Sequence, residues 1–313
     1  MLFYNPHSGQ RRANLGVIVA EVAALLREAG VEASVSETSS AAEVGQQARD
    51  AVEQGFDTIF ACGGDGTIQD VAQGLIGTTA ALAVIPLGTA NVLAHDLGIP
   101  GDALVAARAA LQAVPLRVNV GQIECRNGEG NIVTRYFLSV AGAGQDGYLF
   151  QRLGTGDKRT FGIAAYLLKA LQVWLTHRPE WFSASVSTGP PEQVTQLLAV
   201  RLENFGNVLR NLATGASLLQ EDFRVVLFKS SSRWRYLLFV LRGVLGAHWA
   251  VPGVVLRRAS RITCTSSASG NPVFAEADGE LLGVLPAEIS IVPDALTLLV
   301  PKEFASSRQS QAP

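Results

Sequence analysis

The segment Gly63-Gly64-Asp65-Gly66-Thr67 directly follows the apolar run Thr58-Ile59-Phe60-Ala61-Cys62, and residues 68–75 continue with helical spacing. This order predicts a strand that turns through glycines into a helix. Such a turn presents backbone N–H groups and the positive end of a helix, an arrangement that binds phosphate. Asp65 adds a carboxylate beside that anion, which requires a cation between the two charges. The segment therefore predicts a site for a nucleotide carried with Mg²⁺.

Short apolar runs alternate with helical patterns through residues 1–114. The expected strands are 2–4, 31–35, 58–62 and 82–85, and the expected helices are 13–29, 41–53, 68–75 and 102–113. Alternation at this spacing is typical of a parallel sheet with helices on both faces. The sequence therefore predicts an α/β domain over residues 1–114.

The pattern changes after Pro115, where strand-like runs follow one another. The expected strands are 116–124, 132–141, 183–187, 195–202, 224–229, 261–265, 273–277, 288–292 and 296–300, and two helices, 161–175 and 234–246, interrupt them. This succession predicts a mostly antiparallel β domain over residues 115–305. The polar residues 306–313 are expected to form a disordered tail.

The composition excludes several classes of protein. Apolar residues make up 48% of the 313 residues, and the net charge of −2 comes without a basic block, so nothing indicates nucleic acid binding. Neither the three cysteines nor the four histidines have the spacing of metal ligands. The first residues lack the regions of a signal peptide, and no apolar stretch is long enough to span a bilayer. We expect a cytoplasmic protein with reduced thiols.

Two more segments follow predicted strands of the α/β domain. Asn5-Pro6-His7-Ser8-Gly9 comes after the first strand, and Pro86-Leu87-Gly88-Thr89-Ala90-Asn91 comes after the fourth. Because the carboxyl edge of a parallel sheet is where open α/β folds bind ligands, both segments are candidates for nucleotide contact. Thr89 is open to two interpretations. Its hydroxyl either caps the next helix or reaches the nucleotide together with the Asn91 amide.

A third candidate is the acidic segment Glu276-Ala277-Asp278-Gly279-Glu280 in the β domain. It is either a solvated hairpin tip or a pair of functional carboxylates. In a kinase such a pair would supply a base for the acceptor hydroxyl and a metal ligand.

Two further motifs are weaker. Gly142-Ala143-Gly144-Gln145-Asp146-Gly147 satisfies GxGxxG but lies in the antiparallel region, so we reject a dinucleotide fold. The stretch Arg233-Trp234-Arg235-Tyr236 opens an apolar helix. That helix either lies on a membrane surface or packs on the β domain.

Four segments together carry a resemblance to a known family. The pattern NPxSG, GGDGT with an acid three residues later, PxGTxNxxA and DGE appears here at residues 5–9, 63–67 with Asp70, 86–94 and 278–280. In this order the chain resembles the diacylglycerol kinase catalytic-domain family. It is most similar to the bacterial lipid kinases, which also resemble sphingosine kinases.

The resemblance implies an N-terminal domain like those of NAD kinases and phosphofructokinases and a C-terminal β-sandwich. It implies ATP and Mg²⁺ as cofactors, with Asp65 catalytic and a metal ligand. One of Asp278 and Glu280 would be the base, and the other would serve the metal. Of the two, Glu280 is the expected metal ligand. The residues implied to contact ATP are Asn5, Pro6, His7, Ser8, Gly9, Thr38, Gly63, Gly64, Asp65, Gly66, Thr67, Asp70, Gly88, Thr89 and Asn91.

The chain departs from the family pattern at two places. Gln69-Asp70 replaces the usual Asn–Glu, which is a conservative change. The stretch Ser217-Leu218-Leu219-Gln220-Glu221-Asp222 stands where the bacterial enzymes carry Asp-Asp-Gly around a structural Mg²⁺. Gln220 takes the place of the expected ligand, so that metal is absent, weak, or held by Glu221 or Asp222.

The expected function is an ATP- and Mg²⁺-dependent lipid kinase that transfers the γ-phosphate to a hydroxyl of a diacylglycerol-like or sphingoid lipid. The lipid would be presented at a membrane surface, with peripheral membrane contact, and homodimer formation is left open. One alternative is a catalytically silent nucleotide-binding regulatory protein, which the altered residues 217–222 favour and the intact DGE turn disfavours. The other is NAD kinase, which shares GGDGT but lacks the GTxNxxA segment.

Overall fold

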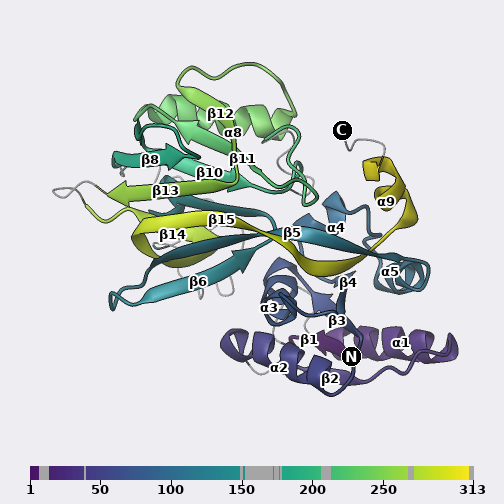
Figure 1. The fold of residues 1–313 in the computed structure, drawn as a ribbon. Coiled ribbons are helices and arrows are strands. Elements are labelled where there is room, and N and C mark those ends of the chain that lie inside the picture. The colour runs from purple at the N-terminus through teal and green to yellow at the C-terminus, as the bar shows by residue number, and fades with distance from the viewer. Residues whose placement is uncertain are drawn as a thin grey trace. The chain divides into compact units, whose positions relative to one another are not determined.

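The computed structural model describes residues 1–6, 14–38, 40–148, 151, 172, 176, 178–205, 213–266 and 271–309. The chain forms two compact units (Figure 1). Unit 1 comprises Met1–Val120, Asn204–Asn207 and Pro293–Pro313, and unit 2 comprises Gly121–Glu203 and Val208–Val292. Two long strands, β5 (Val114–Arg126) and β15 (Glu280–Val300), contribute residues to both units.

Unit 1 is built on a parallel sheet. Its strands are β1 (Leu2–Tyr4), β2 (Val35–Glu37), β3 (Thr58–Gly63) and β4 (Ala81–Pro86), in the spatial order β4-β3-β1-β2. The end of β15 pairs in parallel with β4 at Thr297 and Leu298. Nearly every residue of β3 and β4 is buried, as is typical of parallel strands covered on both faces.

Helices cover this sheet. They are α1 (Leu15–Glu28), α2 (Ala41–Glu53), α3 (Asp65–Leu75), α4 (Val92–Asp96) and α5 (Ala103–Ala110). The α9 helix (Lys302–Gln309) follows β15, and its side chains at residues 302–306 are not buried. One core cluster joins Val22 and Leu26 of α1 to Phe60 and Ile85 of the sheet. The α2 and α3 helices pack backbone to backbone, since a side chain at Gly74 would collide with the carbonyl group of Gly45.

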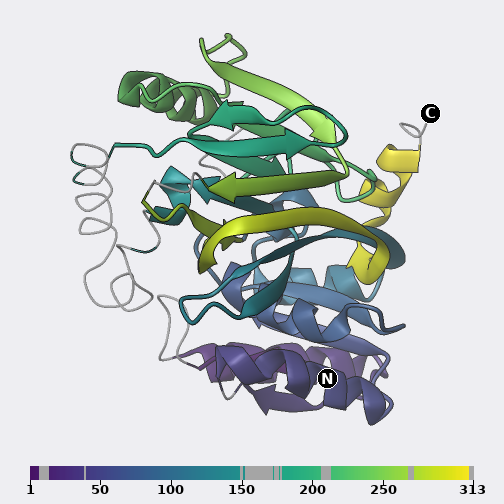
Figure 2. The same ribbon diagram turned by 60° about the vertical axis from the view of Figure 1, so that its left-hand side comes forward.

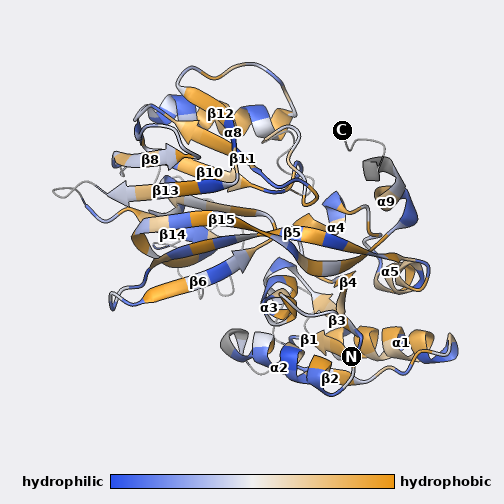
Figure 3. Cartoon of the chain, in the orientation of Figure 1, coloured by the Kyte–Doolittle hydropathy of each residue, from blue (hydrophilic) through white to orange (hydrophobic). Residues whose placement is uncertain are grey.

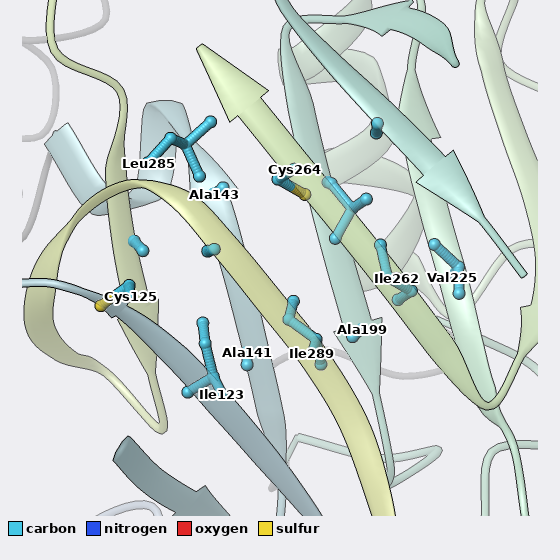
Figure 4. Close-up of a cluster of buried hydrophobic side chains, with 14 of the residues drawn as sticks. Ile123, Cys125, Ala141, Ala143, Ala199, Val225, Ile262, Cys264, Leu285 and Ile289 are labelled. Carbon is cyan, nitrogen blue, oxygen red and sulfur yellow. The ribbon is translucent and has the colours of Figure 1, made fainter. Parts of the chain in front are cut away.

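Unit 2 is an antiparallel β structure. Its strands run in the order β12-β11-β10-β7-β14-β15, while β13 pairs with β15 and β8, β9 with β8, and β5 with β15 and β6. The bounds are β6 (Ile132–Phe137), β7 (Val140–Gly144), β8 (Phe182–Val186), β9 (Glu192–Val194), β10 (Gln196–Val200), β11 (Phe223–Phe228), β12 (Val254–Ala259), β13 (Arg261–Ser266) and β14 (Phe274–Ala277). Small and aliphatic side chains from these strands form its core, as Figure 4 shows for Ile123, Ala199, Val225 and Ile289.

The predicted fold class is confirmed, with a parallel α/β part followed by an antiparallel β part. The compact units divide after Val120 and assign Pro293–Pro313 to unit 1, whereas the sequence suggested a division at residues 114 and 115. Residues 306–309 belong to α9 and not to a disordered tail. The expected helix at 161–175 falls almost wholly outside the described residues.

Several strand predictions are wrong in detail. The strand expected at 31–35 is β2, which begins only at Val35 and ends at Glu37. Strands 288–292 and 296–300 are one strand, β15, because Asp294 keeps a partner at the apparent break: its N–H donates to Asn119 Oδ1, 2.9 Å away. Residues 132–141 divide into β6 and β7. The β12 strand was missed because Arg257 and Arg258 interrupt its apolar pattern, yet it pairs along its whole length with β11.

Candidate active site

The predicted glycine turn joins β3 to α3 in unit 1. The helix begins at Asp65, three residues earlier than the sequence predicted, with Gly64 as its N-cap. Asp65, Gly66 and Thr67 therefore form its first turn, where backbone N–H groups lack partners within the helix. A Cβ at Gly63 would lie 2.6 Å from Thr67 Cβ, so the turn requires glycine there.

The Gly88–Asn91 loop closes against this turn. A side chain at Gly88 would collide with Gly64 Cα and would lie 2.8 Å from Asn91 Oδ1. Asn91 adopts φ 46° and closes the loop on itself, because its Nδ2 donates to the Gly88 carbonyl at 3.0 Å and its Oδ1 accepts from the Gly88 N–H at 2.9 Å. The Asn91 amide therefore shapes the loop. Thr89 is exposed and does not cap α4, whose N-cap residue is Asn91.

Asp65 fastens the two loops together. Its Oδ1 accepts a hydrogen bond from the Val92 backbone N–H at 2.6 Å, in the first turn of α4. Burial raises the pKa of the Asp65 carboxyl, and backbone N–H groups at Val92, Asn91 and Leu93 act in the opposite direction. The carboxylate is thus held in a fixed position beside the N-terminus of α3.

The other residues predicted to contact the nucleotide lie at the same edge of the parallel sheet. In the register of that sheet, Tyr4 lies beside both Glu37 and Cys62, and Cys62 lies beside Ile85. The residues that follow these four, at the carboxyl ends of their strands, include Asn5, Pro6, Thr38, Gly64 and Gly88. Thr38, Thr67 and Asp70 are buried. His7, Ser8 and Gly9 lie outside the described residues.

In unit 2, Asp278 and Gly279 form the turn between β14 and β15. Both have positive φ values, 48° and 82°, as in the two-residue hairpin turns that favour Asp-Gly. The Asp278 carboxylate accepts three backbone N–H groups at 2.9 Å, Leu138 on Oδ2 and Ser139 and Val140 on Oδ1. Asp278 is therefore not part of a solvated hairpin tip.

Burial raises the pKa of Asp278 to about 6, while the three N–H donors oppose the rise. The Ser139 side chain also hydrogen-bonds this carboxylate and opposes the rise, so backbone and side-chain donors together fix its position. Asp278 thus combines a fixed position with a proton affinity suited to a base near neutral pH.

Glu280 has a different environment. Its Oε2 lies 3.1 Å from Arg135 Nη2, and 42% of its side chain is exposed. The third acid, Glu276, is buried and accepts the Gly279 N–H at 3.1 Å. Sequence reasoning missed Arg135 and the backbone donors at 138–140, since β-strand pairing and backbone amides leave no local motif.

The guanidinium group of Arg201 binds the loop at residues 217–222, where the sequence suggested a metal. Arg201 is fully buried, and it donates to the carbonyls of Leu218 (2.9 Å), Gln220 (2.9 Å) and Asp222 (2.7 Å). The Asp222 carboxylate pairs with Arg258, 2.6 Å away. The main-chain carbonyl of Gln220 and the carboxylate of Asp222 are thus engaged by arginines. Among the residues that the structure describes, no group of three or more His, Cys, Asp or Glu gathers as a metal site.

The GxGxxG segment has a structural explanation. Gly142 and Gly144 lie in β7, where a side chain at Gly144 would meet the Thr195 carbonyl. Asp146, which follows, accepts hydrogen bonds from Gln196 Nε2 and the Tyr236 hydroxyl. The glycines therefore serve strand packing within an antiparallel sheet.

Comparisons with known proteins agree with this arrangement. A sequence model of the Diacylglycerol kinase catalytic domain matches residues 1–123, and one of the YegS C-terminal NAD kinase beta sandwich-like domain matches residues 139–300. A diacylglycerol kinase of Bacillus subtilis (strain 168) is 29% identical over 97% of both chains. One of Staphylococcus carnosus (strain TM300) is 23% identical over 99% of this chain and 97% of the other.

Solved structures give the same fold. A diacylglycerol kinase from Bacillus anthracis str. Sterne superposes with a TM-score of 0.70 at 17% identity, covering 97% of each chain. Yeast NADH kinase superposes with a TM-score of 0.53 at 12% identity, covering 99% of this chain and 85% of the other. The chain belongs to the diacylglycerol kinase catalytic-domain family and is a lipid kinase.

Proposed function

We propose that the chain transfers the γ-phosphate of ATP, carried with Mg²⁺, to a hydroxyl of a diacylglycerol-like or sphingoid lipid. The observation that carries this proposal is the pinned carboxylate of Asp65, held 2.6 Å from the Val92 nitrogen beside the glycine turn. A fixed acid next to a phosphate-binding turn fits a metal–phosphate complex and has no role in core packing.

The glycine turn would receive the phosphates of ATP. Gly64 and Gly88 bring two loops together without side chains between them, so a phosphate can approach the backbone. The first-turn N–H groups of α3 would donate to phosphate oxygens, since a helix N-terminus favours negative charge. Asn5, Thr38 and Thr89 follow strands that end at the same edge of the sheet, and they would complete the nucleotide site.

Asp65 would hold the metal. Mg²⁺ in kinases is bound by one or two carboxylates together with phosphate oxygens, so a single fixed carboxylate at this turn fits the ion. When bound, Mg²⁺ neutralises charge that develops on the transferred phosphoryl group.

In unit 2, Asp278 is the better candidate for the base. It would take the proton from the lipid hydroxyl as that oxygen forms a bond to the γ-phosphorus and ADP leaves. Its raised pKa, about 6, and its three N–H donors suit this role, and such a base contributes roughly 10²–10⁴ in rate. Glu280, which is half-exposed and paired with Arg135, would serve the metal or orient the acceptor.

Diacylglycerol is the first acceptor to test, because the relatives that match the whole chain are named diacylglycerol kinases. Sphingoid bases are the second. A catalytically silent regulatory protein is the remaining alternative, and the fully formed, partly buried Asp278 turn argues against it.

The test is transfer of labelled γ-phosphate from ATP and Mg²⁺ to a total lipid extract in mixed micelles, with Asp278→Asn and Glu280→Gln variants. We expect a labelled lipid with wild-type protein, Asp278→Asn reduced by about 10² or more, and no labelling when Mg²⁺ is chelated. ATP binding without any labelled lipid would favour the regulatory protein. Labelling that persists in Asp278→Asn would contradict the assigned base.

A further inference from the structure

The α8 helix (Arg233–Leu245) of unit 2 has an apolar stripe that faces away from the core. The stripe consists of Trp234, Leu237, Leu238, Leu241, Val244 and Leu245, all of them exposed. Their spacing of three and four residues places them on one side of the helix. Trp234 is 71% exposed and Leu245 62%, so these side chains are not the margins of a packed face.

The opposite side of α8 packs on the sheet. The Phe239 ring contacts Phe228 of β11 edge-on at 4.9 Å between centroids, and the Tyr236 ring lies 5.5 Å from Phe228. The Tyr236 hydroxyl also donates to the buried Asp146 carboxylate. The helix is therefore fixed by its inner face, and its stripe is not required for that packing.

Most other exposed large apolar side chains in the described part of the chain are scattered, such as Val17, Val105 and Ile132. Single exposed apolar residues are common in folded proteins, but a contiguous patch indicates an interaction surface. Figure 3 shows both hydrophobic and hydrophilic residues on α8, and in Figure 2 this green helix lies at the outer edge of unit 2.

The surroundings of α8 are basic. Residues 223–275 contain seven arginines, one lysine and no acid, although the whole chain has a net charge of −2. Ion pairs engage Lys229, Arg258 and Arg261. The α8 helix itself has no carboxylate; Arg233 and Arg235 are accessible to solvent, whereas Arg242 is buried and donates to the Ala247 carbonyl. The accessible charge that α8 carries at its first turn, Arg233 and Arg235, is therefore positive and complements an anionic partner.

A cavity of about 540 Å³ lies at the start of α8. It is lined by Arg178, Pro179, Trp181, Ser231 and Arg233. Two guanidinium groups, an indole ring and a hydroxyl are groups that bind a phosphate and its glycerol backbone. The cavity adjoins the apolar stripe through Arg233, which is the first residue of α8.

We propose that α8 docks on an anionic phospholipid bilayer, with its apolar stripe in the acyl boundary and the arginine-lined cavity on a phospholipid headgroup. This inference rests on the proposed action on a membrane lipid and names the surface that brings the enzyme to it. An amphipathic helix with basic residues and a tryptophan on its rim is suited to this position. A second copy fits less well, because a symmetric pairing would bring the arginines of both α8 helices together.

The first test is flotation with vesicles of phosphatidylcholine alone or with roughly 30% phosphatidylglycerol. We expect wild-type protein to float with the anionic vesicles and a Leu241→Glu/Leu245→Glu variant to lose about tenfold in binding. The control is Ile132→Glu, a single added carboxylate, since Ile132 is also exposed and is on β6, which lies at the far side of unit 2 from α8 in Figure 1. Equal binding by the α8 variant and wild type would overturn the proposal.

The second test concerns the cavity. Arg178→Gln/Arg233→Gln should remove the preference for anionic over neutral vesicles, and added salt should do the same to wild type. The control is Arg257→Gln on β12, which removes one positive charge outside the cavity, whereas the cavity variant removes two. If both variants lose the same amount of vesicle binding for each charge removed, binding depends on net charge alone. That result would overturn the headgroup role of the cavity.

Further measurements distinguish other occupants of the stripe. A wild-type dimer in solution that the Leu241→Glu/Leu245→Glu variant dissociates would assign the stripe to a second copy. A large fall in the melting temperature of this variant would mean that the chain itself covers the stripe. Either result would overturn membrane docking.

Kinase assays separate this inference from the proposed function. On a water-soluble short-chain diacylglycerol, the α8 variant should match wild type, while on diacylglycerol in anionic vesicles it should be about tenfold slower. No activity of wild type on any acceptor would refute the proposed function, and flotation would still decide whether α8 binds membranes. Equal activity of both proteins on vesicles would contradict docking through α8.

Discussion

Asp65 begins α3 but caps a different helix, α4, through the backbone N–H of Val92. Its Oδ1 accepts the Val92 N–H at 2.6 Å, while Asn91, the N-cap residue of α4, makes no side-chain cap of its own. The residue that we propose to hold the metal therefore also joins the glycine turn to the Gly88–Asn91 loop. A substitution at Asp65 can thus affect structure and chemistry separately.

Asn at position 65 should separate the two roles. In Asp65→Asn the amide oxygen can still accept the Val92 N–H, so the melting temperature should remain close to that of wild type. Loss of the charge should lower kinase activity by roughly 10² or more. Asp65→Ala should lose the activity and, in addition, about 0.5–2 kcal/mol of stability with the cap. Thermal unfolding and lipid phosphorylation measured on the same samples give both values.

The matched control is Asp102→Asn, which changes the charge of the α5 N-cap, where Asp102 accepts the Leu104 and Val105 N–H groups at 3.0 Å. Its activity should equal that of wild type. Full activity of Asp65→Asn would remove the metal role and leave Asp65 as a cap only.

Substitution of Gly88 should lower stability more than expected for a residue that is only partly buried. A methyl group there would collide with Gly64 Cα, so Gly88→Ala must push the two loops apart. We expect a loss of about 1–3 kcal/mol in the free energy of unfolding. The KM for ATP should rise, since the phosphate site would be distorted. In Gly101→Ala, where nothing lies within 4 Å of the added methyl, both quantities should be unchanged. An unaltered KM in Gly88→Ala would place the nucleotide elsewhere.

The parts of the fold that were predicted correctly depend on local signals. The glycine turn after β3 could be recognised because its strand, its glycines and its helix are contiguous. An acidic turn at residues 276–280 was also expected, although the β15 strand that follows it was not; Asp-Gly is the preferred pair in a two-residue hairpin. In both segments, the residues that determine the turn are adjacent in the sequence.

The parts that were missed depend on partners distant in the sequence. The three N–H donors of Asp278 come from residues 138–140, and backbone groups carry no sequence signature. Arg201 lies 17 residues from Leu218, and nothing in its neighbourhood predicts that it is buried. The β15 strand continues past Pro293 because Asn119, on another strand, accepts the Asp294 N–H. Such features are fixed by tertiary contacts and cannot be read from local pattern.

Arg201 should be essential for stability. Its guanidinium donates to three carbonyls of the 217–222 loop, so Arg201→Met would leave these oxygens buried without a donor. We expect a loss of about 3–5 kcal/mol, because the interaction is buried. Arg201→Lys should be intermediate, since an ammonium cannot reproduce the planar fork. Denaturant unfolding of the purified proteins gives these differences.

Two controls accompany this experiment. Arg258→Gln removes an exposed partner of Asp222 and should leave unfolding unchanged. A metal chelator should also leave the unfolding of wild type unchanged, since Arg201 supplies the cation of the loop. A chelator that lowers the melting temperature in the absence of nucleotide would show that a metal holds this loop after all.

Asp278 should make activity and stability depend on pH in opposite directions. As a base it must be ionised, so kcat/KM should fall about tenfold per unit below about pH 6, its pKa in the folded protein. The unfolded pKa is about 3.9, so the folded protein binds more protons between about pH 4 and pH 6. The stability from this group is therefore present at low pH and is lost as the pH rises through about 6. Urea unfolding of wild type across this range, compared with Asp278→Asn, should show the difference. Identical pH slopes for the two proteins would contradict the raised pKa of this carboxyl.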